Sequence, residues 1–117
     1  MSRQKVRYAR ALAEARINFK SLRSLSTTEV VNRLTQVSGI GIWTAEIYTM
    51  FSLGRADVFA AGDLALQESG RILFGLNERP TEKEIRQMAE SWSPWRAVAA
   101  RLLWAYYAHA KNREGIW

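Results

Sequence analysis

The segment from Leu34 to Asp63, LTQVSGIGIWTAEIYTMFSLGRADVFAAGD, constrains the fold of this chain more than any other stretch. Gly39 and Gly41 lie in a short turn with apolar residues on both sides. Glycine tolerates positive φ and has no side chain, so a phosphate oxygen could approach the peptide N–H groups where the following helix begins. The segment therefore predicts a helical hairpin over residues 34–53, whose second helix runs from about Ile42 to Leu53, followed by a loop that ends at Asp63.

Helix start and stop signals divide the rest of the chain into further helices. Ser26-Thr27-Thr28-Glu29 and Thr81-Glu82-Lys83-Glu84 both match a capping box. Gly54 suits a left-handed helix end, and Pro94 suits the first position of a final helix that reaches about Ala110. No strand pattern competes with these helices, the first of which is expected from Ser2 to about Asn18. The sequence predicts an all-α protein, a compact orthogonal helical bundle in which residues 1–117 form a single domain.

Apolar spacing predicts which helix faces are buried. The helix that begins near Ile42 is apolar on most sides, so we expect it to be deeply buried at the centre of the fold. The first and last helices each carry one apolar face that is expected to point inward, comprising Val6, Ala9, Leu12, Ala13 and Ile17 in the first and Val98, Leu102, Leu103 and Tyr106 in the last.

Composition excludes several classes of protein. The 117 residues suffice for one small core, and a hydrophobic fraction of 48% favours a packed globule over a disordered tail. There is no cysteine, hence no disulfide or thiolate metal site, and the single histidine, His109, has no metal-ligand spacing around it. No apolar run approaches the roughly 18 residues of a membrane span. These features indicate an intracellular, cytoplasmic protein with no membrane partner.

The excess of positive over negative charge lies at the start of the chain. The formal net charge is +6, and residues 1–23 contain seven basic residues against one acidic residue, Glu14. The remainder carries equal numbers of each sign, so the whole excess lies in the first segment. A basic stripe of this kind suits a nucleic-acid backbone, and a solvated helix face is the alternative.

Two later motifs accompany the hairpin in the sequence. They are Asp57-Val58-Phe59-Ala60-Ala61-Gly62-Asp63 and Trp92-Ser93-Pro94-Trp95-Arg96 with Leu103-Trp104. Together these residues resemble the helix-hairpin-helix DNA glycosylases, and within them the 3-methyladenine DNA glycosylase II group. The resemblance spans Ser2 to about Tyr107. It implies a monofunctional enzyme of base excision repair, associated with the nucleoid, that flips alkylated purines such as 3-methyladenine and 7-methylguanine out of double-stranded DNA and hydrolyses their N-glycosidic bond without a required cofactor.

The resemblance also assigns roles to individual residues. Asp63 matches the catalytic aspartate of the family, whereas its position before Leu64 also suits a helix cap. Trp43 occupies the position where bifunctional relatives have a Schiff-base lysine, which implies that no lyase step occurs. Trp43 and Trp104 would line the base pocket, and the alternative is that both belong to the core. Trp92 and Trp95 are expected to be packing residues of the core. Asp57, beside Arg55, is predicted to be a turn or ion-pair residue.

At the hairpin the resemblance implies two kinds of backbone site. Gly39, Gly41 and Thr44 would contact the DNA backbone. The carbonyls of Thr35, Val37 and Ile40 match positions at which the family often holds a monovalent cation, Na⁺ or K⁺. This chain has Ala60 where the family usually has proline, which predicts a looser loop before Asp63.

Three hypotheses follow from these observations. The first is a glycosylase, or its catalytic C-terminal part, and the second is a non-catalytic hairpin module that binds DNA. The third is a helical fragment that associates with itself or with an N-terminal partner segment through exposed apolar surface. The family has a long portion before the SRQKVRYARALAEA stretch, which predicts that this chain is a truncated form or a shortened natural product.

Overall fold

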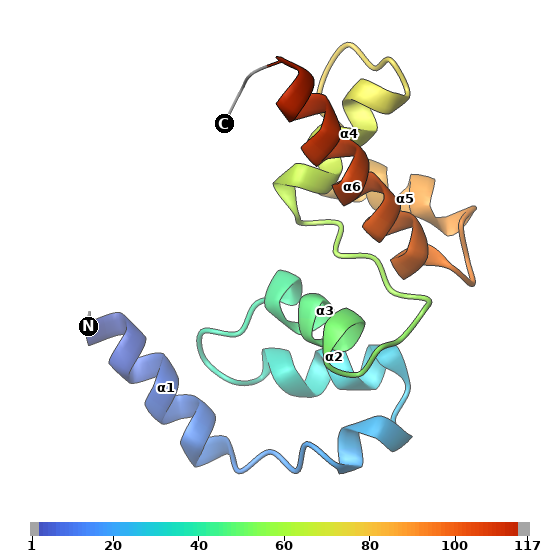
Figure 1. Cartoon of the computed structure of the whole chain (residues 1–117). Coiled ribbons are helices and arrows are strands. Elements are labelled where there is room, and N and C mark those ends of the chain that lie inside the picture. Colours follow the sequence, from blue (N-terminus) through green and yellow to red (C-terminus); the bar gives the residue numbers. More distant parts are fainter. Residues whose placement is uncertain (1–2, 115–117) are drawn as a thin grey trace. The chain divides into compact units, whose positions relative to one another are not determined.

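The computed structural model describes residues 3–114, with the side chain of Glu114 excepted. All regular elements in this range are helices (Figure 1). They are α1 (Arg3–Ala15), a 3-10 turn η1 (Ser21–Ser24), α2 (Thr27–Thr35), α3 (Ile42–Phe51), α4 (Leu64–Leu73), α5 (Glu82–Glu90) and α6 (Arg96–Glu114). The all-α fold and the hairpin between α2 and α3 are confirmed. The chain divides into two compact units, Met1–Gly54 and Arg55–Trp117. A single domain of residues 1–117 stays a prediction.

The first unit is built around the packing of α2 against α3. Apolar residues spaced at helical intervals place one stripe of α2 against α3, and the turn η1 closes the end of this small core. Its fully packed members are Leu22, Val30, Leu34 and Ala45, with Ile17, Leu25, Val31, Ile40, Tyr48 and Leu53 partly buried around them.

In the second unit α4 packs against both α5 and α6. The hydroxyl of Ser69, which is completely buried, donates to the Leu103 carbonyl of α6 at 2.8 Å. On the other side, a Cβ added at Gly70 would lie 3.4 Å from Ile85 Cδ1, an ordinary van der Waals distance, so α5 packs directly against this part of α4. The aromatic ring of Trp92 packs between Phe59 and Phe74, with centroids 5.6 and 6.2 Å away.

Side-chain and glycine signals set several helix boundaries as predicted. Thr81 and Glu84 form the complete reciprocal capping box that starts α5, with Thr81 N–H bound to Glu84 Oε1 at 2.9 Å. The Ser26 hydroxyl accepts from Glu29 N–H at 3.2 Å and begins α2. Gly54 has φ of 65°, in the left-handed region expected after α3. Pro94 is not the first residue of the last helix, because α6 begins at Arg96.

Burial differs from prediction in three helices. Helix α1 contains no buried residue, and of its predicted apolar face only Ile17, beyond the helix end, packs on the core. Helix α3 is buried on one side only: Ala45, Glu46, Thr49 and Met50 are buried, whereas Ile42, Trp43 and Phe51 are about half exposed. In α6 Leu103 is buried, whereas Val98 and Leu102 are exposed. Trp95, expected in the core, is 61% exposed. Small units bury a limited fraction of their surface, so apolar faces on their helices stay open.

None of the helices within residues 3–114 combines the length and the apolar character that crossing a membrane would require.

Candidate active site

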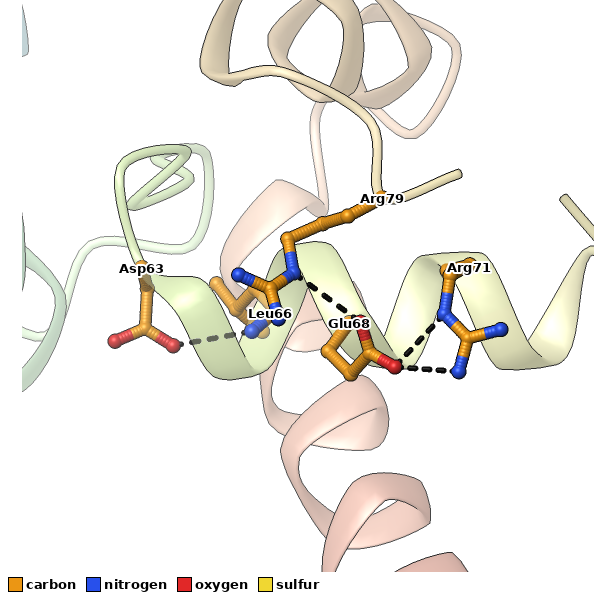
Figure 2. A network of polar contacts seen from close by, with 5 residues as sticks. All are labelled: Asp63, Leu66, Glu68, Arg71 and Arg79. Carbon is orange, nitrogen blue, oxygen red and sulfur yellow. Dashed lines mark hydrogen bonds and ion pairs between the residues drawn. The ribbon is translucent and has the colours of Figure 1, made fainter. Parts of the chain in front are cut away.

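Asp63 is the N-cap residue of α4 and directly precedes its first residue, Leu64. Its backbone is extended, with φ of −76° and ψ of 121°, and its Oδ2 accepts the N–H of Leu66 at 3.1 Å (Figure 2). The predicted cap is therefore confirmed. A carboxylate in this position meets the positive end of the helix dipole, which favours negative charge there. The side chain stays partly exposed, so capping does not bury it.

Trp104 on α6 meets the same oxygen. Its indole Nε1–H donates to Asp63 Oδ2 at 2.9 Å, across 41 residues of sequence. The resemblance names Trp104 as a pocket residue, but neither motif nor spacing predicts this hydrogen bond. Trp104 is half-buried and so is not simply part of the core. The structure thus brings together Asp63 and Trp104, two of the predicted site residues.

The loop that leads to Asp63 is buried and hydrogen-bonded, and the looser loop expected at Ala60 stays a prediction. Residues 58–61 are all buried, and Ala60 is completely so. The Ala60 carbonyl accepts the N–H of Asp63 at 2.9 Å. The buried side chain of Gln67 donates to the Ala61 carbonyl at 2.8 Å. Burial and these two bonds restrain the backbone of the loop at a position that has no proline ring.

Asp57 fixes the other end of this loop. Its carboxylate accepts two bonds from the Arg96 guanidinium, at 2.7 Å from Nε and 2.9 Å from the terminal nitrogen, and one from the Ser93 hydroxyl at 2.7 Å. Beside it, Ala97 N–H donates to the Ala56 carbonyl at 2.7 Å. The predicted ion pair exists, with Arg96 as the partner that the sequence did not identify. The hydrogen bond from Arg96 is the main reason that the pKa of Asp57 lies well below its usual range.

Replacing Asp57 by asparagine is expected to destabilise the second unit by about 1–2 kcal/mol at neutral pH, a figure already reduced because both side chains are partly exposed. Since the folded-state pKa is depressed, this stabilisation is present above the unfolded-state value of about 3.9 and is lost as pH falls toward the folded-state value. The free energy of unfolding of both proteins can be measured with urea between pH 7 and pH 3. The difference between Asp57→Asn and the unchanged chain should become smaller as the pH falls. Glu82→Gln removes an exposed ion pair on α5 and should change little. A difference independent of pH would contradict the account.

Further along α4, Glu68 ties the helix to the loop before α5. One carboxylate oxygen accepts from Arg71 and the other from Arg79, as Figure 2 shows. The hydrogen bond from Arg71, followed by that from Arg79, holds the pKa of Glu68 below its ordinary value. This network joins α4 to the loop before α5, and no motif in the sequence predicted the contact with Arg79.

The remaining predicted site residues lie in the first unit, around the hairpin. Gly39 has φ of 93°, and the ring of Tyr8 from α1 lies directly against it. Gly41 caps α3 with extended backbone, and an added Cβ there would meet nothing within 4 Å. The surroundings of Gly41 are therefore open to a ligand atom. Thr44 is exposed in the first turn of α3, and Trp43 is 47% exposed.

The three carbonyl groups proposed to bind a cation lie at the end of α2 and in the turn after it. Thr35 is the last residue of that helix, and the Val37 carbonyl accepts the N–H of Ile40 at 3.1 Å. Because a carbonyl oxygen has a second lone pair, this bond is compatible with cation binding. Carbonyl oxygens are also the ligand type that hard cations favour. Among the described residues no group of three histidine, aspartate or glutamate side chains could hold a metal.

Comparison with known proteins identifies relatives of this arrangement. No protein-family model matches the sequence. DNA-3-methyladenine glycosylase 1 of Schizosaccharomyces pombe is 37% identical over 108 residues, which cover 88% of this chain and 47% of the relative. The structure of the S. pombe glycosylase Mag1 in complex with abasic DNA superposes with a TM-score of 0.78 at 36% identity, covering 89% of this chain and 53% of that chain.

A second solved structure, the DNA-3-methyladenine glycosidase of Bacillus halodurans, gives a TM-score of 0.80 at 36% identity and covers 92% of this chain. The chain spans about half the length of the S. pombe relative and of these two solved structures. Similarity of this extent in both sequence and fold goes well beyond a shared hairpin. In sequence and in fold, this chain is therefore homologous to the DNA-3-methyladenine glycosylases over about half of their length.

Proposed function

We propose that this chain carries the catalytic part of a monofunctional DNA glycosylase that hydrolyses the N-glycosidic bond of alkylated purines in double-stranded DNA. The observation that carries the proposal is the Asp63 carboxylate, which is partly exposed and fixed by donors from α4 and α6. Asp63 also matches the family's catalytic aspartate. The reaction belongs to base excision repair, and its site of action would be the nucleoid inside the cell.

The chemistry requires negative charge near the sugar. As the bond between C1′ and the base nitrogen breaks, the base leaves with the electron pair and positive charge develops on the deoxyribose. A fixed carboxylate stabilises that charge and orients a water molecule, whose oxygen forms the new bond to C1′ and whose proton is released. Preorganisation matters because a carboxylate that is already oriented needs no rearrangement during the reaction.

Trp43 supports hydrolysis over a lyase mechanism. An indole cannot form a Schiff base with the sugar, so a covalent imine is not expected at this position. Its exposed ring can instead stack on a flipped base. Purines such as 3-methyladenine and 7-methylguanine carry positive charge, to which an electron-rich indole is attracted.

The hairpin would supply the contact with the DNA backbone. The open surroundings of Gly41 and the first turn of α3 allow a phosphate oxygen to approach backbone N–H groups. We propose that Gly39, Gly41 and Thr44 form this contact. A Na⁺ or K⁺ ion on the carbonyls of Thr35, Val37 and Ile40 would add positive charge beside the phosphate. The basic residues exposed on α1 provide further attraction.

The test is the identity of the products formed from duplex DNA that carries 7-methylguanine or 3-methyladenine. We expect free base, detected by chromatography, and an abasic strand that breaks only after alkali. Borohydride should trap no covalent adduct between protein and DNA. A trapped adduct would contradict hydrolysis, and an absence of released base would contradict the proposed activity.

A second function, that of a non-catalytic DNA-binding module, is favoured by one observation. The hairpin and the basic helix α1 belong to the first compact unit, whereas Asp63 belongs to the second. Such a module would bind duplex DNA in a salt-dependent manner without releasing base. Binding that survives Asp63→Asn but weakens in Gly41→Val, with no base release by any form, would identify it.

A further inference from the structure

We propose that Trp104 is a positioning residue, which sets the orientation of the Asp63 carboxylate through its indole N–H. The proposal goes beyond a role as pocket wall, because it assigns the function to a hydrogen bond and not to the face of the ring. Its consequence for catalysis depends on the proposed glycosylase function, whereas the positioning itself does not.

Two donors from different helices converge on one oxygen. Asp63 Oδ2 accepts the backbone N–H of Leu66 in α4 at 3.1 Å and the Nε1–H of Trp104 in α6 at 2.9 Å. A single hydrogen bond to a carboxylate still allows the group to rotate about that contact. A second donor from another element restricts that rotation, because the lone pairs of a carboxylate oxygen lie in the plane of the group, so the placement of both helices influences that plane.

The two helices are themselves held at a second point. The buried Ser69 hydroxyl of α4 donates to the carbonyl of Leu103, the residue before Trp104, at 2.8 Å. Gln67, also buried, binds the Ala61 carbonyl in the loop that leads to Asp63. The backbone on both sides of the bond between Trp104 and Asp63 is therefore fixed by buried contacts, and the indole N–H transmits that rigidity to the carboxylate.

Loss of this bond should affect chemistry more than DNA binding. A carboxylate that is not held in one orientation stabilises the developing sugar charge less well, and small displacements of catalytic groups can lower rates by about 100-fold. The effect should be the same for different lesions, because it acts on the sugar and not on the base. A stacking role of the ring predicts the opposite, a loss that depends on which base is removed.

The hydrogen bond can be tested without any activity measurement. In ¹H–¹⁵N spectra of the whole chain, the Trp104 indole resonance, assigned from its disappearance in Trp104→Phe, should exchange slowly with solvent. It should shift and exchange faster in Asp63→Ala, whereas the resonance of Trp95, whose ring is largely exposed, should not change. An unchanged Trp104 resonance in Asp63→Ala would overturn the proposal. If Trp104→Phe does not fold, the Trp104 indole signal is assigned instead by through-bond correlation with its own backbone resonances.

The catalytic consequence requires single-turnover base release. Trp104→Phe keeps an aromatic ring but loses the donor, and should lower the rate constants for 7-methylguanine and 3-methyladenine by an equal factor of about 10 to 100, with DNA affinity unchanged. Trp95→Phe is the matched control and should retain the full rate. Full activity in Trp104→Phe, or a loss confined to one lesion, would overturn the positioning role. If the unchanged chain releases no base while the Trp104 resonance responds to Asp63→Ala, the proposed function fails and the positioning stands.

Discussion

Replacing Gly39 by alanine is expected to destabilise the first unit by about 2–4 kcal/mol. Two effects add. Gly39 has φ of 93°, a left-handed conformation that alanine adopts only with strain. In addition, its Cβ would lie 2.5 and 2.6 Å from Cδ1 and Cδ2 of Tyr8, and closer still to Cγ. These atoms are near the root of the side chain, so the ring cannot simply swing aside and α1 or the hairpin must move.

Gly41→Ala is the matched control, because Gly41 has φ of −89° and open space around it. That change should cost only a fraction of the Gly39 effect, through a poorer helix cap. Thermal unfolding followed by circular dichroism measures both, and the indole resonance of Trp43 reports on the first unit. The double change Tyr8→Ala and Gly39→Ala should relieve the overlap but retain the strain at φ. Equal losses in Gly39→Ala and Gly41→Ala would contradict the packing described here.

Local signals predicted the helices well because each depends on residues close in sequence. The capping box at Thr81 and the left-handed Gly54 are set by neighbours within one helical turn. The start of α6 was misplaced because Pro94 is merely compatible with a first helical position and does not require it.

Contacts between distant residues could not be predicted in the same way. The bond from Trp104 to Asp63 and the pair of Arg96 with Asp57 join residues 41 and 39 positions apart. Helical periodicity states which face of a helix is apolar, but not what covers it, which is why exposure of Leu102 and Val6 was missed. Family resemblance identified Asp63 as a candidate, and the structure adds the donors that hold it.

Asp63→Asn is expected to lower single-turnover base release by about 100-fold or more, a loss comparable to removal of one preorganised electrostatic group in other enzymes. Asparagine has nearly the same shape and retains an oxygen that can accept from Leu66 and Trp104, so α4 should keep its cap. The negative charge opposite the developing sugar cation is lost. DNA affinity should be unchanged, because a phosphate contact at the hairpin does not involve this carboxylate.

Glu68→Gln is the matched control, since it removes a carboxylate charge from the same helix, where Glu68 binds Arg71 and Arg79. It should release base at the rate of the unchanged chain. The most direct test of the account is therefore the single-turnover rate of 7-methylguanine release from duplex DNA by the unchanged chain, Asp63→Asn and Glu68→Gln. Release should be lost only in Asp63→Asn. Equal release by the unchanged chain and Asp63→Asn would contradict the catalytic role of Asp63.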